Sequence, residues 1–269
     1  MAISFISDLH LDKSRPHINK YFIEYLNHLD NSVTDLYILG DLFEYWVGDD
    51  DPMDGLGEVR SAITDLGKKI NIWYMHGNRD FLVSKSICKD LKINLLDDPT
   101  VIDIGNVKIL LLHGDTLCTD DNEYQNFRSM VRSSAWQKEM LSKSLEERLA
   151  IANNLREKSI EANRLKGEEI MDVNNTEVMN IIETYKPNVI IHGHTHRPNI
   201  HRHNEVIRYT SFEDMEIKTS LLRGIYTLGY ETPSMIQQKG EGPTPMSKYL
   251  AEFGNQIRPL ETALLSEIE

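Results

Sequence analysis

Three histidines surround a single glycine where an apolar run ends, in residues 190–198, which read Ile-Ile-His-Gly-His-Thr-His-Arg-Pro. An extended strand would deliver Gly193 at its tip. Because glycine has no Cβ, the backbone can turn sharply there and present His194 and His196 to one side. A buried core histidine usually occurs alone, whereas histidines clustered at a strand end more often bind a metal ion. The segment therefore predicts a strand that ends in metal ligands.

The same pattern, a short apolar strand followed by polar residues, occurs four more times upstream. The expected strands cover residues 2–7, 35–39, 70–75 and 107–112, and a further strand is expected at 101–104. The polar residues at their ends are Asp8 and His10, Asp41, Asn78, and His113. Aspartate, asparagine and glycine are also ordinary turn formers, so each position alone is compatible with a simple turn. Together with the histidines, the repetition favours one ligand site at the carboxyl ends of the strands.

Helical spacing between these strands indicates a layered α/β fold. Helices are expected at residues 17–29, 56–66 and 81–92, and from an N-cap at Asn174 or Asn175 to about Tyr185. Residues 120–170 have no strand pattern and interleave apolar side chains with arginine and lysine, which predicts an inserted helical cap. The basic residues of the cap indicate either an anionic partner or a solvated helix face.

Composition limits the partners of the chain. The 42 Asp and Glu residues exceed the 29 Lys and Arg residues, and the net charge of −13 repels nucleic acid and anionic membranes unless a local basic face overrides it. Cys88 and Cys118 form neither a disulfide framework nor a Cys-x-x-Cys zinc site, which favours a reducing compartment. The sequence has no apolar run of the roughly 18 to 20 residues that a membrane span needs, and its first residues lack a signal-peptide pattern. We therefore expect a soluble cytoplasmic protein.

The polar strand ends together supply ligands for two divalent metal ions held about 3.5 to 4 Å apart, as in two-metal hydrolases. One carboxylate must then bridge both ions, and Asp41, alone at its strand end, is the candidate. Asp8 and His10 with one of the two late histidines would bind one ion. Asn78 and His113 with the other late histidine would bind the second. Nitrogen and oxygen ligands without thiolate suit Mn²⁺, Fe or Zn²⁺ better than Ca²⁺, and Mn²⁺ is the first expectation.

Such a pair of ions predicts phosphoester hydrolysis, because it provides a nucleophilic water and holds the oxygens of a phosphoryl group. Arg79, next to Asn78, can offer its planar guanidinium to a phosphate oxygen and stabilise the charge that grows on it. A structural salt bridge is the alternative role of Arg79.

Five short motifs resemble those of the calcineurin-like metallophosphoesterases. They are Asp8-Leu9-His10, Gly40-Asp41, Gly77-Asn78-Arg79-Asp80, His113-Gly114-Asp115 and Gly193-His194-Thr195-His196. The resemblance implies a layered α/β sandwich, with mixed β-sheets flanked by helices and the cap inserted at about 120–170. Many members of that superfamily carry a histidine after the Gly-Asn pair as an acid for the leaving oxygen, whereas this chain has Arg79. Without that acid the leaving group should depart as a stable anion, as a phosphate does and an alkoxide does not, so we expect a diphosphate substrate.

Longer segments resemble the UDP-2,3-diacylglucosamine hydrolases, a family of the lipid A pathway in Gram-negative bacteria. They lie at residues 39–50 (LGDLFEYWVGDD), 76–82 (HGNRDFL), 113–121 (HGDTLCTDD) and 170–174 (IMDVN). The resemblance covers residues 1 to about 207 and implies attack of water at the α-phosphorus of UDP-2,3-diacylglucosamine with Mn²⁺ bound. The products would be UMP and 2,3-diacylglucosamine 1-phosphate (lipid X). It also implies a peripheral position on the cytoplasmic face of the inner membrane.

The same resemblance implies roles for individual residues. The first Mn²⁺ would be bound by Asp8, His10, Asp41 and His196, and the second by Asp41, Asn78, His113 and His194. Catalysis would use Asn78 and Arg79, and the substrate would be bound by Asn78, Arg79, Asp121, Ser159, Asn163, Lys166 and His194. Ser159, Asn163 and Lys166 fall on one helical face, which supports this assignment, although a solvated face shows the same spacing. The apolar side chains of the cap would either line a cleft for two acyl chains or pack on the core.

The resemblance ends before the C-terminal segment, residues 208–269. Residues 226–235 match the closing strands of the family only faintly, and residues 246–267 show helical spacing, so we expect a strand remnant followed by a helix. Two other functions remain open. One is a dinuclear phosphoesterase that acts on another nucleotide diphosphate. The other is a non-catalytic scaffold of the same fold, which would require missing ligands.

Overall fold

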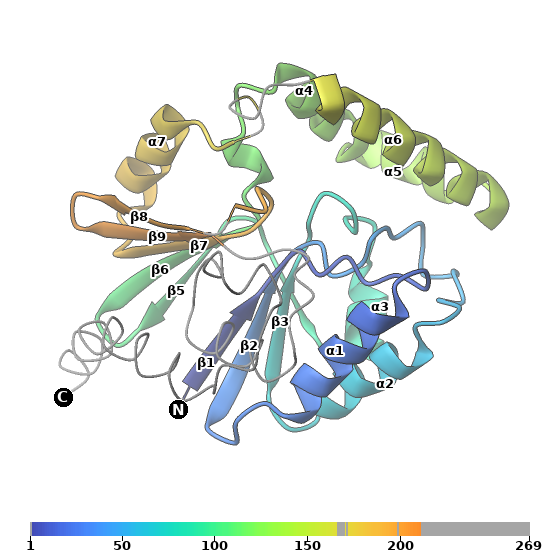
Figure 1. Ribbon diagram of the computed structural model, residues 1–269, viewed down its shortest axis with the longest axis horizontal. Helices are drawn as coiled ribbons and strands as arrows, with labels where there is room; N and C mark the ends of the chain where they lie inside the picture. The colour runs from blue at the N-terminus through green and yellow to red at the C-terminus, as the bar shows by residue number, and fades with distance from the viewer. Residues whose placement is uncertain (1, 166–169, 171, 198, 211–269) are drawn as a thin grey trace, which may run out of the picture.

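The computed structural model describes residues 2–165, 170, 172–197 and 199–210, without the side chains of residues 163–165. The first part of the chain forms a parallel sheet with the strand order β1-β2-β3-β4. Its strands are β1 (Ala2–Ile6), β2 (Val33–Leu39), β3 (Asn71–Met75) and β4 (Asn94–Leu96). Parallel strands need crossover connections. Helices α1 (Pro16–Asn27), α2 (Gly57–Leu66) and α3 (Lys85–Asp90) lie in these crossovers, so the carboxyl ends of the four strands share one edge (Figure 1).

The second sheet has the order β5-β6-β7-β9-β8 and is mixed. Its three inner strands, β6 (Val107–Leu112), β7 (Val189–His192) and β9 (Val206–Thr210), are parallel. The two edge strands, β5 (Thr100–Ile104) and β8 (Asn199–His203), are antiparallel to their neighbours. Helix α7 (Asn175–Tyr185) precedes β7, and the side chain of Asn174 accepts hydrogen bonds from the backbone N–H groups of Thr176 and Glu177. Of the two predicted N-caps, the structure selects Asn174.

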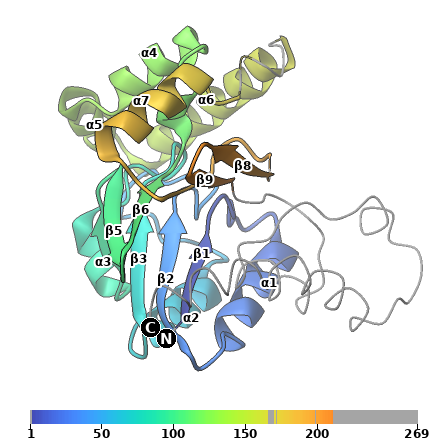
Figure 2. The ribbon, with the colours of Figure 1, turned by 90° about the vertical axis from the view of Figure 1, so that its left-hand side faces the viewer.

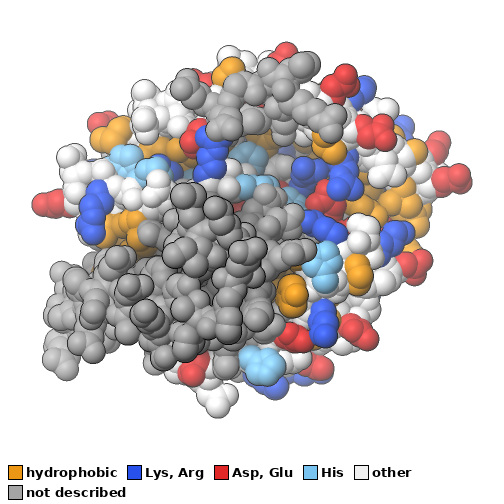
Figure 3. Space-filling model, viewed as in Figure 1, with side chains coloured by type: hydrophobic (Ala, Val, Ile, Leu, Met, Phe, Trp, Pro, Cys, Tyr) orange, Lys and Arg blue, Asp and Glu red, His pale blue; other side chains and the backbone are white. Residues whose placement is uncertain are grey.

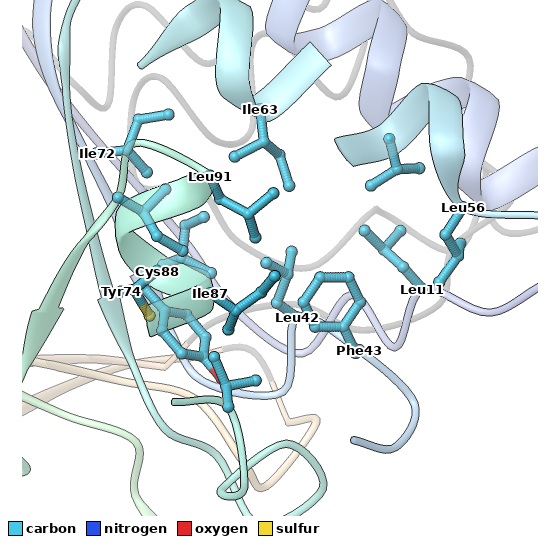
Figure 4. Close-up of a cluster of buried hydrophobic side chains, with 14 of the residues drawn as sticks. Leu11, Leu42, Phe43, Leu56, Ile63, Ile72, Tyr74, Ile87, Cys88 and Leu91 are labelled. Carbon is cyan, nitrogen blue, oxygen red and sulfur yellow. The ribbon is translucent and has the colours of Figure 1, made fainter. Parts of the chain in front are cut away.

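Alternating apolar side chains pack the two sheets against each other. Tyr37 and Leu39 of β2 face Ile109 and Leu111 of β6 in one buried cluster, as the two-residue period of strands requires. The opposite face of the first sheet packs on α1, α2 and α3 in the largest cluster, part of which is shown in Figure 4. The opposite face of the second sheet packs on α7. Figure 2 shows the resulting order of layers, and the predicted sandwich of sheets between helices is confirmed.

The predicted cap is confirmed as three helices inserted between β6 and α7. They are α4 (Asn122–Val131), α5 (Ser134–Leu141) and α6 (Leu145–Leu165), and they lie beyond the carboxyl ends of the strands (Figures 1 and 2). Arg148 of α6 joins the cap to the core, because it is buried and its guanidinium donates to Val47 O and Asp50 Oδ1, both at 2.7 Å. Within the described residues, no helix combines the length and apolar character needed to cross a bilayer.

The helix predicted at residues 81–92 is wrong in its first part. Helix α3 covers only Lys85–Asp90 and begins after Ser84, whose hydroxyl accepts from Ser86 N and Ile87 N as an N-cap. Residues 81–84 form a turn instead, in which Val83 N donates to Asp80 O at 3.0 Å. The apolar residues of this segment are buried because they pack on the core, and they do not form one face of a helix.

Two further differences concern strand ends. The short edge strand β4 was not predicted, because its three residues carry too little pattern, and strands β8 and β9 were not predicted either. Strand β9 continues to Thr210, three residues beyond the domain limit expected at 207, because it pairs with both β7 and β8. The strand remnant and helix predicted for the C-terminal segment lie outside the described residues.

Candidate active site

Five strand ends from both sheets converge beneath the cap. Asp8 and His10 follow β1, Asp41 follows β2, Asn78 follows β3, His113 follows β6, and His194 and His196 follow β7. Hydrogen bonds between these loops keep them together, since Asp8 N donates to Gly40 O at 3.1 Å and Gly193 N to His113 O at 2.7 Å. Figure 3 shows histidine, lysine and arginine side chains gathered in the middle of this face, between the cap and the sheets. The structure therefore brings all seven predicted metal ligands to one place.

Backbone strain is concentrated in these loops. Nine described non-glycine residues have a positive φ, and five of them are Asp8, His10, Asp41, His194 and His196. The left-handed region is sterically unfavourable for residues with a Cβ and persists only where the surrounding structure enforces it. Such strain at five predicted ligands indicates that the loops are shaped for the positions of their side chains.

Two glycines allow the loops to approach one another. A Cβ on Gly77 would lie 2.0 Å from Asp41 Oδ1, and a Cβ on Gly193 would lie 2.2 Å from Asp8 Oδ2. Both distances are far below van der Waals contact, so any larger residue would displace a carboxylate of the site. The glycines beside the polar residues thus serve close packing of ligand loops as well as turns.

Asp8, His10 and His196 form one possible metal-binding group, in which one ligand atom from each residue lies within 4.8 Å of the others. His196 Nε2 lies 3.7 Å from Asp8 Oδ1, and the rings of His10 and His196 are 5.3 Å apart. This arrangement is compatible with the first predicted ion.

A second possible group contains Asp8, Asp41 and His113. Asp41 Oδ2 lies 3.9 Å from both His10 Nε2 and His113 Nε2, between the two expected ion positions. That position is compatible with a bridging carboxylate. Asp8 also reaches this group, a proximity that the sequence did not predict.

The side chain of Asn78 lies between two of the predicted ligand histidines. Asn78 Oδ1 lies 3.0 Å from His113 Nε2 and 2.9 Å from His194 Nδ1. The other ring nitrogen of His113 lies 2.9 Å from Leu39 O, a carbonyl that can only accept, so this nitrogen carries a proton. In a neutral ring Nε2 would then direct a lone pair at the Asn78 oxygen. With the oxygen on this side, a proton or a metal ion fits between them, and the nitrogen and oxygen donors suit a divalent cation.

The charge of the cluster has a measurable consequence for metal binding. Burial lowers the pKa of His113, but Asp41, Asp115 and Asp8 together raise it to about 9, so His113 is protonated near pH 7 in the metal-free chain. A ligand histidine must be neutral, and metal binding should therefore release at least one proton at pH 7. The apparent affinity should increase as pH rises towards 9 and level off above it. Calorimetric titration with Mn²⁺ in two buffers of different ionisation enthalpy measures this release, and an affinity independent of pH between 7 and 9 would contradict it.

Arg79 lies at the edge of the candidate active site, and its backbone supports Asp41. Arg79 N donates to Asp41 Oδ1 at 2.8 Å, while its guanidinium Nη1 lies 3.6 Å from Glu44 Oε1. Burial acts to raise the pKa of Glu44, but the hydrogen bond with His10 and the charge of Arg79 lower it on balance. Glu44 was not predicted, although a single acidic residue among the apolar residues 42–47 is a signal for it.

Tyr124 and Asp115 were also missed by the sequence analysis. The ring of Tyr124 stacks on His194 with centroids 5.6 Å apart, and its hydroxyl donates to Asp115 Oδ2 at 2.9 Å. Arg128 donates to the same oxygen at 2.7 Å. These residues support His194 from the cap side, and only the histidine motif that contains Asp115 hinted at them.

The predicted substrate residues of the cap are described in part. The Asp121 side chain is buried and accepts from Tyr124 N at 3.0 Å as the N-cap of α4. Ser159 is half-buried on α6. The side chain of Asn163 and the whole of Lys166 lie outside the described residues.

Sequence comparisons place this site in a known class. Residues 1–198 match the family described as calcineurin-like phosphoesterase. The chain belongs to this family, it is a hydrolase of the metallophosphoesterase type, and its site is one for divalent metal ions.

Individual relatives narrow the class. The chain is 47% identical over 202 residues to the UDP-2,3-diacylglucosamine hydrolase of Marinobacter nauticus, covering 75% of this chain and 83% of the relative. It is 44% identical over 210 residues to the enzyme of the same name from Chromobacterium violaceum, covering 78% and 89%. It thus belongs to the UDP-2,3-diacylglucosamine hydrolase branch of the family. Among solved structures, an archaeal phosphodiesterase matches with a TM-score of 0.40 and 16% identity over 79% of this chain and 84% of that chain.

Proposed function

We propose that this chain hydrolyses the diphosphate bond of UDP-2,3-diacylglucosamine and releases UMP and 2,3-diacylglucosamine 1-phosphate, a step of lipid A biosynthesis. The high identity to curated enzymes of that name supports the substrate. The convergence of seven nitrogen and oxygen ligands on one strand edge supports the reaction, and this convergence is the observation that carries the proposal. The function also includes peripheral association with the cytoplasmic face of the inner membrane.

The metal ligands are proposed as the family resemblance implies them. Asp8, His10, Asp41 and His196 would bind one ion, and Asp41, Asn78, His113 and His194 the other. When bound, two Mn²⁺ ions lower the pKa of a water and offset the charge of a phosphoryl group. The chain itself orients these ligands: His194 N donates to both carboxylate oxygens of Asp8 at 3.0 Å, and Leu39 O fixes the ring of His113.

The remaining residues act on the substrate. Arg79 would bind an oxygen of the attacked phosphate, and its guanidinium carries a permanent charge that cannot protonate a leaving oxygen. The nearest histidine in sequence, His76, is directed away, because its Nε2 lies 2.7 Å from Val83 O. A leaving group that departs as a phosphate anion needs no acid, which supports a diphosphate. Asp121, Ser159, Asn163 and Lys166 would bind the rest of the substrate, and the apolar side chains of the cap would contact its acyl chains.

Replacing Arg79 by alanine should lower kcat by about 10²-fold, since a donor aimed at developing charge typically contributes that much. Metal content should not change, because the bond from residue 79 to Asp41 comes from the backbone, which alanine retains. Steady-state rates and metal analysis of the purified variant measure both quantities. Arg202→Ala, on the exposed surface of β8, is the matched control. Joint loss of rate and metal would show that Arg79 is structural.

The substrate is tested by comparing UDP-2,3-diacylglucosamine with unacylated UDP-sugars and CDP-alcohols in the presence of Mn²⁺. We expect the acylated substrate to be preferred, and preference for an unacylated one would identify the chain as a phosphoesterase of other nucleotide diphosphates. In water enriched in the heavy oxygen isotope, attack at the α-phosphorus should label UMP and not the lipid product. Bound metal near two ions per chain without turnover of any diphosphate would instead indicate a non-catalytic scaffold.

A further inference from the structure

Glu44 lies three residues after Asp41, and four basic side chains surround it. Its side chain is only 8% exposed. The contacts are His10 Nδ1 at 3.3 Å, Arg15 Nη2 at 3.3 Å, Arg79 Nη1 at 3.6 Å and Arg156 Nε at 3.1 Å. Three guanidinium groups therefore share contact with a single buried carboxylate.

The two oxygens of Glu44 contact different groups. Oε2 faces the core, where it contacts His10 and Arg15. Oε1 faces the cap and contacts Arg79 and Arg156. The first pair of contacts anchors the carboxylate, and the second pair brings together guanidinium groups from two separate layers of the fold, the loop after β3 and helix α6.

Two guanidinium groups repel each other at short range unless an anion lies between them. The side chains of Arg79 and Arg156 are 28% and 45% exposed, whereas the carboxylate between them is buried. A ligand that enters beneath the cap therefore meets the two cations first and the anion behind them. This arrangement suits a ligand with two neighbouring negative groups, because each planar guanidinium group can donate two parallel hydrogen bonds to the oxygens of one phosphate.

We propose that Glu44 is a positioning residue that holds Arg79 and Arg156 side by side as a paired binding site for the two phosphoryl groups of the substrate. The proposal rests on the proposed function only in that the substrate is a diphosphate. Glu44 itself does not contact the reacting atoms. Its effect on the reaction passes through the two arginines, one from the core and one from the cap.

A second ion pair between the cap and the core, Arg148 with Asp50, has a structural role only. Arg148 of α6 pairs with Asp50, but Arg148 is 3% exposed and also donates to Val47 O, so no ligand can reach its guanidinium. Asp50→Asn is therefore a matched control. It weakens one bond between cap and core without touching the paired arginines.

The test is a double-mutant cycle of Glu44→Gln and Arg156→Ala in the full chain with Mn²⁺. Each single variant should lower kcat/KM by about 10- to 100-fold, since misplacement of a binding group typically has an effect of that size. The double variant should be within about 2-fold of the worse single variant, because Arg156 contributes only while Glu44 holds it in place. Metal content should be unchanged in all three, and Asp50→Asn should lower Tm without changing KM.

Three results would overturn the proposal: near-normal kcat/KM in Glu44→Gln, multiplicative losses in the double variant, or loss of metal from Glu44→Gln, which would mean that Glu44 acts through His10. The cycle uses whichever nucleotide diphosphate the unaltered chain hydrolyses. Failure of UDP-2,3-diacylglucosamine as substrate therefore leaves the cycle measurable and counts against the proposed function alone. A chain that hydrolyses no diphosphate would overturn both.

Discussion

Asp41→Asn should reduce kcat/KM by roughly 10³-fold or more, a loss of about 4 kcal/mol of transition-state stabilisation. Asparagine has nearly the same size and can still accept from Arg79 N through its oxygen, but an uncharged NH2 group, which donates and cannot bind a cation, replaces Oδ2. Asp41 Oδ2 lies between His10 and His113, so the loss of its charge should weaken both ion positions at once. The variant should therefore bind fewer than two metal ions as well as lose turnover.

Metal analysis and rates at increasing Mn²⁺ concentration test this expectation. High Mn²⁺ should restore part of the activity if weak metal binding is the main defect. Asp103→Asn, at an exposed position of β5, changes the net charge equally and should behave as the unaltered chain. Two tightly bound ions and a normal rate in Asp41→Asn would refute the bridging role.

Gly77→Ala should abolish measurable hydrolysis although it adds a single methyl group. The new Cβ would lie 2.0 Å from Asp41 Oδ1 and 2.2 Å from Asp41 N, and Asp41 already has a positive φ. Gly77 N also donates to the buried side chain of Asp80 at 2.9 Å, which fixes its position. Overpacking of this kind typically destabilises a fold by about 1 to 3 kcal/mol.

Turnover, metal content and Tm of the Gly77→Ala variant should all decrease. Gly57→Ala is the matched control, because a Cβ on Gly57 meets nothing within 4 Å and the residue begins helix α2. Alanine there should leave activity unchanged and leave stability equal or slightly higher. An active Gly77→Ala variant with normal metal content would show that the loops are not as closely packed as the structure indicates.

The sequence predicted most of the architecture because its strands are short, apolar and ended by polar residues. Strands β1, β2, β3, β6 and β7 were expected nearly where they occur, and the motif resemblance to the family is confirmed. The helix predicted at 81–92 begins only at Lys85, after the Ser84 N-cap, and the turn before it follows Asp80, whose side chain accepts from Leu42 N at 2.8 Å and from Gly77 N. Periodicity alone cannot register such a bond between distant segments.

The sequence predicted which residues form the site but not which of them contact one another. Sequence motifs identified seven possible ligands and Arg79, and their roles remain proposals. They did not reveal that Asp8 approaches Asp41 and His113, that Tyr124 stacks on His194, or that Glu44 contacts four side chains from three segments. Each of these contacts joins residues that are far apart in the chain.

What the sequence by itself determined is therefore local: which residues form strands, which polar groups end them, and which chemistry those groups can support. Only the tertiary structure decided which groups meet. Parallel strands carry their carboxyl ends to one edge, but the spacing of that edge depends on packing between the sheets and on the absence of a Cβ at Gly77 and Gly193. The pairing of Arg79 with Arg156 through Glu44 likewise exists only once the cap lies over the core.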